Sequence, residues 1–237
     1  MAAPLLLVVA IMFVTVAWLF RQTINVQPWQ EAGIGSAENS SSGGSFHVPP
    51  AAVVLAIFLA VATSLFALSV AAYFMRMMQG DWSGFVFPNI LWANTGVLIV
   101  SDLAMRSARN AARRGESGAV RNALAFCGAC TVLFLVGQVH AWQQLNSQGF
   151  FGGSVSSSPS NSFFYLFTAL HAAHVLGGFF VLGRTTLRVW RDADAARVRV
   201  NVELCTTYWH YLLGVWLVLV ALLVPAISEL CRARLFS

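Results

Sequence analysis

Six long apolar segments constrain the fold of this 237-residue chain more than any other feature of its sequence. A helix that crosses about 30 Å of hydrocarbon needs about 20 mostly apolar residues. No segment shows the alternation of a barrel strand, and an open sheet in lipid would leave its edge groups without hydrogen bonds. The sequence therefore predicts an all-α protein, a polytopic transmembrane helix bundle of about six spans. The expected spans are Ala2–Phe20, Pro50–Phe74, Phe87–Met105, Asn122–Trp142, Phe163–Gly183 and Val202–Ile227.

The composition excludes two other classes of protein. Only 10% of the residues are charged, whereas a soluble globular domain is about 25% charged. No stretch between the apolar segments is long enough to bury a core of its own. All 14 basic residues are arginine, and their clustering in short connections is typical of membrane orientation rather than of phosphate binding. We therefore expect neither a soluble domain nor a nucleic-acid partner.

The arginines also predict the orientation of the bundle. The connections Arg106–Arg121 and Arg184–Asn201 each hold several arginines, whereas Gln143–Ser162 is uncharged and rich in Ser and Gly. The positive-inside rule places the two arginine-rich connections in the cytoplasm. Because arginine is the sole basic residue, which is typical of a GC-rich bacterial genome, we expect a multi-pass protein of a bacterial inner membrane.

The chain divides into two parts. Residues 1–49 combine an N-terminal transmembrane anchor with a flexible linker that contains a run of Ser and Gly. Residues 50–237 hold the other five apolar segments and predict a five-helix bundle.

The histidines within these segments are candidates for function, because polar groups are costly in lipid. His171 and His174 are three residues apart and share one helix face. Neutral imidazole is the commonest metal ligand, so His174 and His210 could hold a haem between facing helices. The alternative is hydrogen bonding between helices, and the sequence favours it because no second motif supports a cofactor.

Two carboxylates are also candidates. Asp102 precedes Arg106 by four residues, which favours an ion pair on one helix, with a place on a proton path as the alternative. Glu203 begins the last segment, where it is either a proton relay or a helix-N-terminal carboxylate paired with an arginine of the preceding connection. The sequence contains no phosphate loop, no nucleophile with its base and no metal-spaced Cys/His cluster, so we expect no catalytic, cofactor-binding or metal site in this chain.

Small residues predict where two helices approach closely. Ala169, Ala173 and Gly177 are spaced by four residues. Such a small-residue stripe allows close contact between transmembrane helices.

Four motifs follow one another along the chain. Asn94-Thr95 precedes Ser101, and residues 134–138 read FLVGQ and end in Gln138. Residues 162–178 read SFFYLFTALHAAHVLGG and include the two neighbouring histidines. In the last segment Glu203 is followed by Tyr208-Trp209-His210 and then Trp216.

This series resembles subunit III of the haem-copper cytochrome c oxidases. The family carries N-T…S, F-L-x-x-Q, T-G-x-H-G-x-H-V and E-A-A-x-x-Y-W-H-F-x-D-x-x-W in the same order. Three of the family's carboxylates have no counterpart here. Pro50–Phe74 lacks the glutamate of a buried Ser-Glu pair, Leu213 stands at the aspartate of the last motif, and Ala141 stands at a glutamate three residues after the glutamine. The roles of those carboxylates are therefore not carried over.

The resemblance implies a non-redox accessory subunit of a respiratory terminal oxidase, which takes part in aerobic electron transport and proton translocation. Haem and copper would lie on the partner subunits I and II, with no cofactor in this chain. The chain would stabilise subunit I, assist proton uptake and hold membrane phospholipid in a cleft. Asp102 and Glu203 would belong to a proton-collecting surface. The motif residues with a structural role would be Asn94, Thr95, Gln138, His171, His174, Glu203, Trp209 and His210.

Two alternatives stay open at this point. One alternative to the role in a cytochrome c oxidase is a stand-alone membrane haem protein that uses His174 and His210, which predicts a visible spectrum. The other is a subunit-III-like partner of a quinol oxidase or a nitric oxide reductase. The electron donor is selected by other chains.

Overall fold

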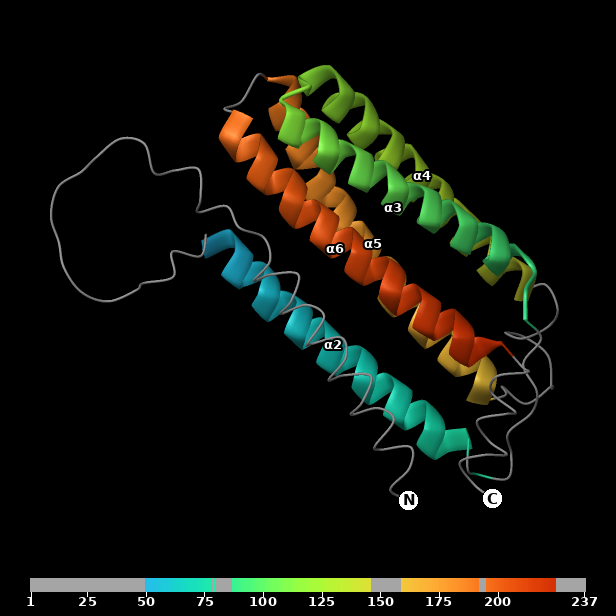
Figure 1. Ribbon diagram of the computed structural model, residues 1–237. Helices are drawn as coiled ribbons and strands as arrows, with labels where there is room; N and C mark the ends of the chain where they lie inside the picture. The colour runs from blue at the N-terminus through green and yellow to red at the C-terminus, as the bar shows by residue number, and fades with distance from the viewer. Residues whose placement is uncertain (1–49, 78, 80–86, 146–158, 192–194, 225–237) are drawn as a thin grey trace, which may run out of the picture.

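The computed structural model describes residues 50–77, 79, 87–145, 159–191 and 195–224. These residues form five helices and no strand (Figure 1), so the all-helical class is confirmed. The first expected span, Ala2–Phe20, and the linker after it lie outside the described residues, as do residues 225–227 of the last expected span. The helices are α2 (Pro50–Met77), α3 (Ile90–Arg114), α4 (Ser117–Leu145), α5 (Pro159–Trp190) and α6 (Ala195–Leu223).

Four of the described helices are long and apolar enough to cross a membrane, namely α2, α4, α5 and α6. The sequence predicted a span at α3 as well, and α3 differs from the others because polar residues recur along it. Asn94, Thr95, Ser101 and Asp102 are all buried on its inner side, and arginines occupy its last turns.

The helices extend further into the arginine-rich connections than the sequence predicted. α3 continues to Arg114, and a single tight turn leads into α4 at Ser117. Arginine is a strong helix former, so α3 continues through its arginines and ends only at the glycine that follows them. Gly115 adopts φ 74°, and its N–H bonds to carbonyls in the last turn of α3, as in many glycine-capped helix ends. α5 likewise includes Arg184 and Arg188.

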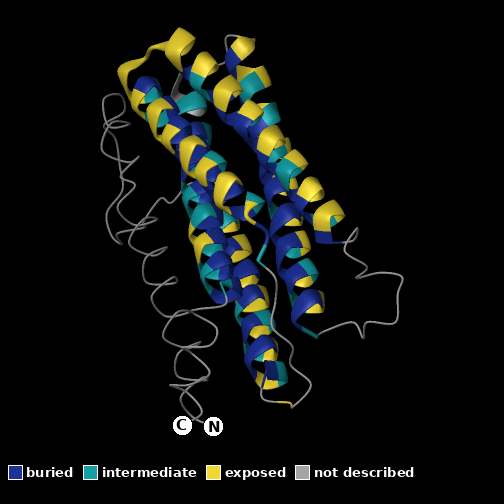
Figure 2. Cartoon of the chain, turned by 90° about the vertical axis from the view of Figure 1, so that its right-hand side faces the viewer, coloured by how far each residue is buried: buried dark blue, intermediate teal, exposed yellow. Residues whose placement is uncertain are grey.

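Helices α3 to α6 pack into a bundle, and α2 lies along one side of it (Figure 1). The closest pairs are α3 with α4 and α3 with α6, followed by α5 with α6 and α4 with α5, whereas α2 contacts mainly α5 and α6, and only lightly. Buried residues lie where the helices face each other, and exposed residues follow their outer sides (Figure 2). Helices α3 and α5 end, and helices α4 and α6 begin, at the same end of the bundle. We call this the arginine-rich end.

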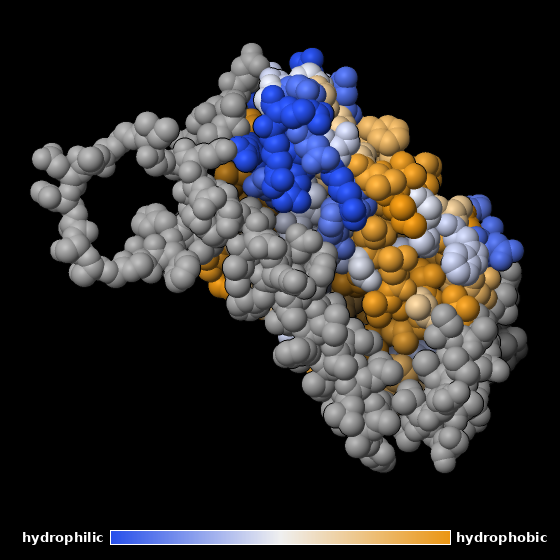
Figure 3. Space-filling model, in the orientation of Figure 1, coloured by the Kyte–Doolittle hydropathy of each residue, from blue (hydrophilic) through white to orange (hydrophobic). Residues whose placement is uncertain are grey.

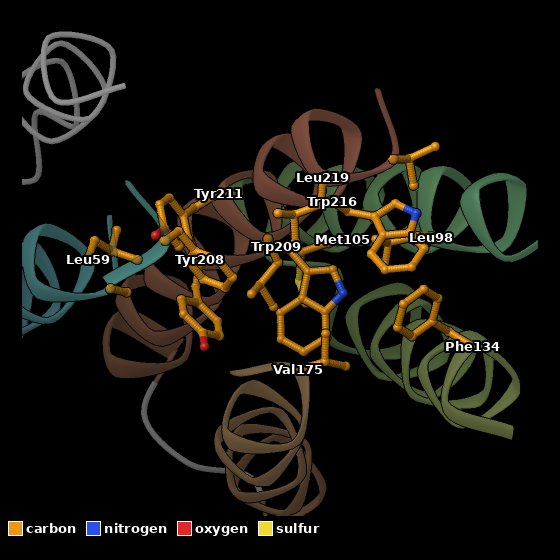
Figure 4. Packing of buried hydrophobic residues seen from close by; sticks show 14 of the residues in the cluster. Leu59, Leu98, Met105, Phe134, Val175, Tyr208, Trp209, Tyr211, Trp216 and Leu219 are labelled. Atoms are coloured by element: carbon orange, nitrogen blue, oxygen red, sulfur yellow. The ribbon is translucent and has the colours of Figure 1, made fainter. Parts of the chain in front are cut away.

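Aromatic side chains of α6 fill the core in two directions. Trp209 and Trp216 point toward α3 and α4, and the Trp216 ring lies 5.0 Å from that of Phe134. Tyr211 points the other way, toward Leu59 of α2, and the hydroxyl of Tyr208 points toward α5 (Figure 4), where it donates to the carbonyl of His174. α6 therefore packs on both sides and is the most buried of the four candidate spans.

The outer faces carry many large apolar side chains. One flank of the molecule is hydrophobic and the arginine-rich end is hydrophilic (Figure 3). Exposed apolar residues of this kind are expected where lipid or another subunit replaces water. They include Val54, Ile57, Val61 and Leu68 of α2, Phe126, Leu133 and Val136 of α4, and Leu166, Leu176 and Phe180 of α5.

The closest approach of α5 to α6 does not involve the predicted stripe. Ala169, Ala173 and Gly177 are exposed, so that prediction was wrong. Gly178, which is buried, lies against the ring of Tyr208 instead, and a Cβ at this position would collide with that ring. Consecutive positions on a helix point about 100° apart, so a shift of one residue changes the contact completely.

Replacing Gly178 with alanine therefore tests this packing, and its neighbour Gly177 provides a matched control. Both substitutions gain helix propensity, but a Cβ at Gly177 has no neighbour within 4 Å. We expect Gly178→Ala to destabilise the protein by about 1–3 kcal/mol because Tyr208 must move. Gly177→Ala should not lower the thermal midpoint in detergent. Equal midpoints for the two variants would contradict the described contact.

Candidate functional site

Polar side chains of α3 and α6 meet in a row, which we call the α3–α6 seam. It consists of Thr95, Ser101, Asp102, Arg109 and Arg113 of α3 and Glu203, Trp209, His210 and Trp216 of α6. The two helices are antiparallel, so residues early in α3 pair with residues late in α6.

Two tryptophans connect the apolar part of the seam. Trp216 Nε1 donates to Thr95 Oγ1 at 3.0 Å, and Trp209 Nε1 donates to Ser101 Oγ at 3.0 Å. All four residues are buried. An indole N–H can only donate, and a buried one without an acceptor is costly. These two bonds therefore select the axial position of α6 relative to α3.

Asp102 is a buried carboxylate that lies between an exposed arginine and a partly buried histidine. Its Oδ2 accepts a hydrogen bond from Arg106 Nε at 3.0 Å, which confirms the ion pair predicted from their spacing. Its Oδ1 lies 2.6 Å from Nδ1 of His210. The ring N–H is not aligned with Oδ1 as in a regular hydrogen bond, but the separation is within the range of a charge-assisted contact. The side chain of Asp102 is 3% exposed and that of His210 is 14% exposed.

Glu203 pairs with arginines of α3. Its Oε1 accepts a hydrogen bond from Arg113 Nε at 3.0 Å, and Arg109 Nε lies 4.0 Å from the same oxygen. Pairing with arginine was predicted from the connection before α6, and the partners found among the described side chains, Arg109 and Arg113, come from α3 instead. Glu116 and Arg114 form a separate pair at the surface, where their hydrogen bond lowers the pKa of Glu116.

The remaining motif residues make other contacts between helices. Asn94 Nδ2 donates to Gln138 Oε1 at 3.4 Å and joins α3 to α4. Asn94 also lies so close to Gly137 that a Cβ there would collide with its amide. His171 Nε2 donates to the carbonyl of Leu212 at 3.1 Å and joins α5 to α6.

The structure does not bring His174 and His210 together. His174 Nδ1 donates to the carbonyl of Leu170 in its own helix, and its ring lies 5.2 Å from that of Phe66 in α2. His210 faces Asp102 on α3 instead. The geometry does not support a haem between these two histidines. Within the described ranges, no three His, Cys, Asp or Glu side chains are placed to hold a metal ion.

A cavity of about 730 Å³ lies on the other side of α6, between α2, α5 and α6. Val54, Leu55 and Phe58 of α2 provide apolar walls, and Arg184 and Arg188 of α5 line it as well. Since both arginines belong to the last turns of α5, the cavity combines an apolar interior with positive charge at the arginine-rich end.

The spacing of the charged residues along α3 and α6 is a sequence signal for the charged half of the seam. Asp102, Arg106, Arg109 and Arg113 are spaced by four, three and four residues, so they form one stripe along α3. Glu203 and His210 form a shorter stripe on α6. Matching the two stripes in antiparallel register would have predicted the observed pairs.

Comparisons with known proteins agree with these motifs. The chain matches the family model described as "Cytochrome c oxidase subunit III" over residues 56–224, which includes nearly all of the described helices. It is 29% identical over 168 residues to cytochrome c oxidase subunit 3 of Corynebacterium diphtheriae, an alignment that covers 68% of this chain and 80% of the relative. It is 23% identical over 210 residues to cytochrome c oxidase subunit 3 of Synechocystis sp., covering 84% of this chain and 88% of the relative.

Glu203→Gln tests the charged half of the seam. Glutamine would leave Arg109 and Arg113 without a counter-charge on α6, so we expect the free energy of unfolding to fall by about 1–3 kcal/mol. Glu116→Gln is the control, because it removes an exposed ion pair of the kind that contributes little. Thermal unfolding in detergent measures both variants, and the pairing is refuted if Glu203→Gln is as stable as the parent.

Proposed function

Because the chain belongs to the cytochrome c oxidase subunit III family, we propose that it acts as the accessory subunit III of a respiratory haem-copper terminal oxidase in a bacterial inner membrane. In this role the chain carries no redox centre. It stabilises subunit I, which with subunit II holds haem and copper, and it assists proton uptake.

The α3–α6 seam is the observation that carries the proposal. The family-motif residues of two distant segments meet there in direct contacts, including Thr95 with Trp216 and Ser101 with Trp209. In these contacts the polar groups bind one another inside the bundle. The outer faces of α2, α4 and α5 are apolar. Such faces fit a subunit that stabilises its neighbour by packing rather than by chemistry.

The arginine-rich end supports the role in proton uptake. We assign this end to the cytoplasm from the positive-inside rule. Of the two expected members of a proton-collecting surface, Glu203 lies about two turns from this end and is bound to Arg113. Asp102 lies in the middle of α3 and is bound to Arg106. Their burial restricts proton exchange to the edge of the seam rather than to an open carboxylate surface.

The cavity between α2, α5 and α6 supports the binding of membrane phospholipid. Its apolar walls fit an acyl chain, and Arg184 and Arg188 fit a phosphate group. The lipid would fill space that the light contact between α2 and the bundle leaves open.

Purification in mild detergent through a tag on this chain tests the assignment. We expect a haem-copper subunit I to co-purify and to be identified by mass spectrometry, and we expect the oxidase without this chain to lose activity sooner during turnover. The co-purifying partners also distinguish a cytochrome c oxidase from a quinol oxidase or a nitric oxide reductase. Recovery of the chain alone, with a haem spectrum that is lost in His174 and His210 variants, would contradict the proposal.

Gly177→Leu tests the lipid site. Gly177 lines the cavity and has open space at its Cβ, so a leucine would project into the volume meant for lipid. Gly183→Leu is the matched control, because Gly183 also has open space but does not line the cavity. We expect less phospholipid per purified complex with Gly177→Leu and an unchanged amount with Gly183→Leu, measured by lipid mass spectrometry. An unchanged amount in both variants would exclude this cavity as a lipid site.

A further inference from the structure

We propose that the outer face of α3 is the surface on which this chain binds a transmembrane helix of subunit I, and that this helix presents uncharged hydrogen-bond acceptors to Arg106. The inference rests on the proposed function, in which the chain stabilises subunit I, and it assigns that contact to one face of one helix.

The outer face of α3 has the spacing of a contact between helices. Exposed residues recur along it at alternating intervals of four and three, and we call this row the outer α3 stripe: Trp92, Gly96, Ile99, Leu103 and Arg106. This alternation keeps one line of side chains facing a partner helix. Trp92 and Leu103 are each more than half exposed, and a Cβ at Gly96 has no neighbour within 4 Å. The described helices therefore leave this row uncovered, and Gly96 permits the close approach of another helix.

Arg106 places a charge on this stripe near the middle of the membrane. Its Nε donates to Oδ2 of Asp102 at 3.0 Å, and Asp102 is the central residue of α3 (Ile90–Arg114). The neighbouring Ser101 bonds to Trp209, which is the central residue of α6. Since a helix rises about 1.5 Å per residue, each end of α3 lies about 18 Å from Asp102, more than half of a hydrocarbon core of about 30 Å. The bond to Asp102 thus holds the guanidinium toward the membrane centre, whereas a long cationic side chain in lipid ordinarily extends to the headgroups.

The guanidinium has hydrogen-bond donors that the described helices do not use. The side chain of Arg106 is 56% exposed, whereas that of Asp102 is 3% exposed. Arginine carries five N–H donors in a planar fork, and in the described part of the chain the two Nη groups have no acceptor. Charged groups within spans face protein or water-filled cavities rather than lipid, because hydrocarbon offers no acceptor. The exposed side of Arg106 therefore requires a protein surface against it.

The charge balance defines the chemistry of that surface. Asp102 already compensates Arg106, so a carboxylate from the partner would add an uncompensated negative charge at this depth. A side-chain amide, a hydroxyl or a backbone carbonyl accepts from the Nη groups without adding charge. The rest of the partner helix must be apolar, because Ile99 and Leu103 lie beside Arg106 on the stripe.

Two other occupants fit these requirements less well. In a symmetric pair of copies with this face at its two-fold axis, the two Arg106 side chains would approach each other and repel. The expected span outside the described residues, Ala2–Phe20, has a single side-chain oxygen, that of Thr15. We therefore assign the face to subunit I, the neighbour that the chain is proposed to stabilise.

Gly96→Leu in the assembled oxidase tests the contact, and Gly183→Leu is the matched control. Both glycines are helical with open space at the Cβ, and Gly183 belongs to α5, which packs on α4 and α6 and not closely on α3. We expect a tagged Gly96→Leu chain to retain about tenfold less subunit I than the parent after a detergent wash, because the leucine would hold the two helices apart. The Gly183→Leu chain should retain the parent amount.

Arg106→Lys tests the polar part of the contact, with Arg121→Lys as its control. Lysine keeps a cation beside Asp102 but lacks the planar fork that reaches the partner, so retained subunit I should fall by about fivefold. Arg121 is exposed near the start of α4, and its replacement should change nothing. In the parent complex, photoreactive benzoylphenylalanine in place of Leu103 should cross-link to subunit I, which mass spectrometry identifies.

Parent-like retention in Gly96→Leu or in Arg106→Lys would overturn the inference, and so would an equal loss in the matched controls. A cross-link from position 103 to residues 1–49, to a second copy or to lipid alone would overturn it as well. The proposed function fails differently, because in that case the parent chain itself retains no haem-copper subunit I.

Discussion

Polar groups that enter a bilayer must find their partners inside the protein, and α3 is the described helix on which this requirement acts most strongly. It carries an amide, two hydroxyls and a carboxylate along its buried side. α4 satisfies the amide through Gln138, and α6 donates two indole N–H groups to the hydroxyls. The carboxylate of Asp102 binds Arg106 of its own helix and faces His210 of α6. Because α3 must be enclosed by these two helices, it organises the bundle although its own composition is the least typical of a span.

The same requirement explains what the sequence could and could not predict. Apolar length is a local property, so the five expected segments within the described residues were each recognised as a helix. The end of α3 was misplaced because arginine favours helix and extends α3 to Arg114. The pairing of His210 with Asp102 follows only when the charged stripe of α3 is matched to that of α6 in antiparallel register, and neither helix specifies this register on its own. The small-residue stripe failed for a related reason: the bulky side chain that selects the contact, Tyr208, belongs to the other helix.

α6 separates two environments with adjacent residues. Tyr208 contacts the carbonyl of His174 on the cavity side, and Trp209 contacts Ser101 within the seam. The apolar cavity and the charged residues of the seam thus lie on different sides of α6, and Trp209 belongs to both, because it bonds to Ser101 in the seam and also lines the cavity. A change on one side reaches the other mainly through movement of α6 as a unit, since the tryptophan bonds hold it against α3.

The distance along the chain between seam partners has a consequence for biosynthesis. Ser101 and Trp209 are 108 positions apart, and Thr95 and Trp216 are 121 apart. During translation, α3 is made long before α6, and α4 provides partners for Asn94 and Ser101 through Gln138 and Cys127 while Thr95 and Asp102 still lack their partners on α6. α2, which lacks such buried charge, can reside in lipid alone until α5 and α6 arrive. The nascent chain therefore exposes its least lipid-compatible helix until the last helix is made, and this interval is when protection by the insertion machinery or by a partner subunit matters most.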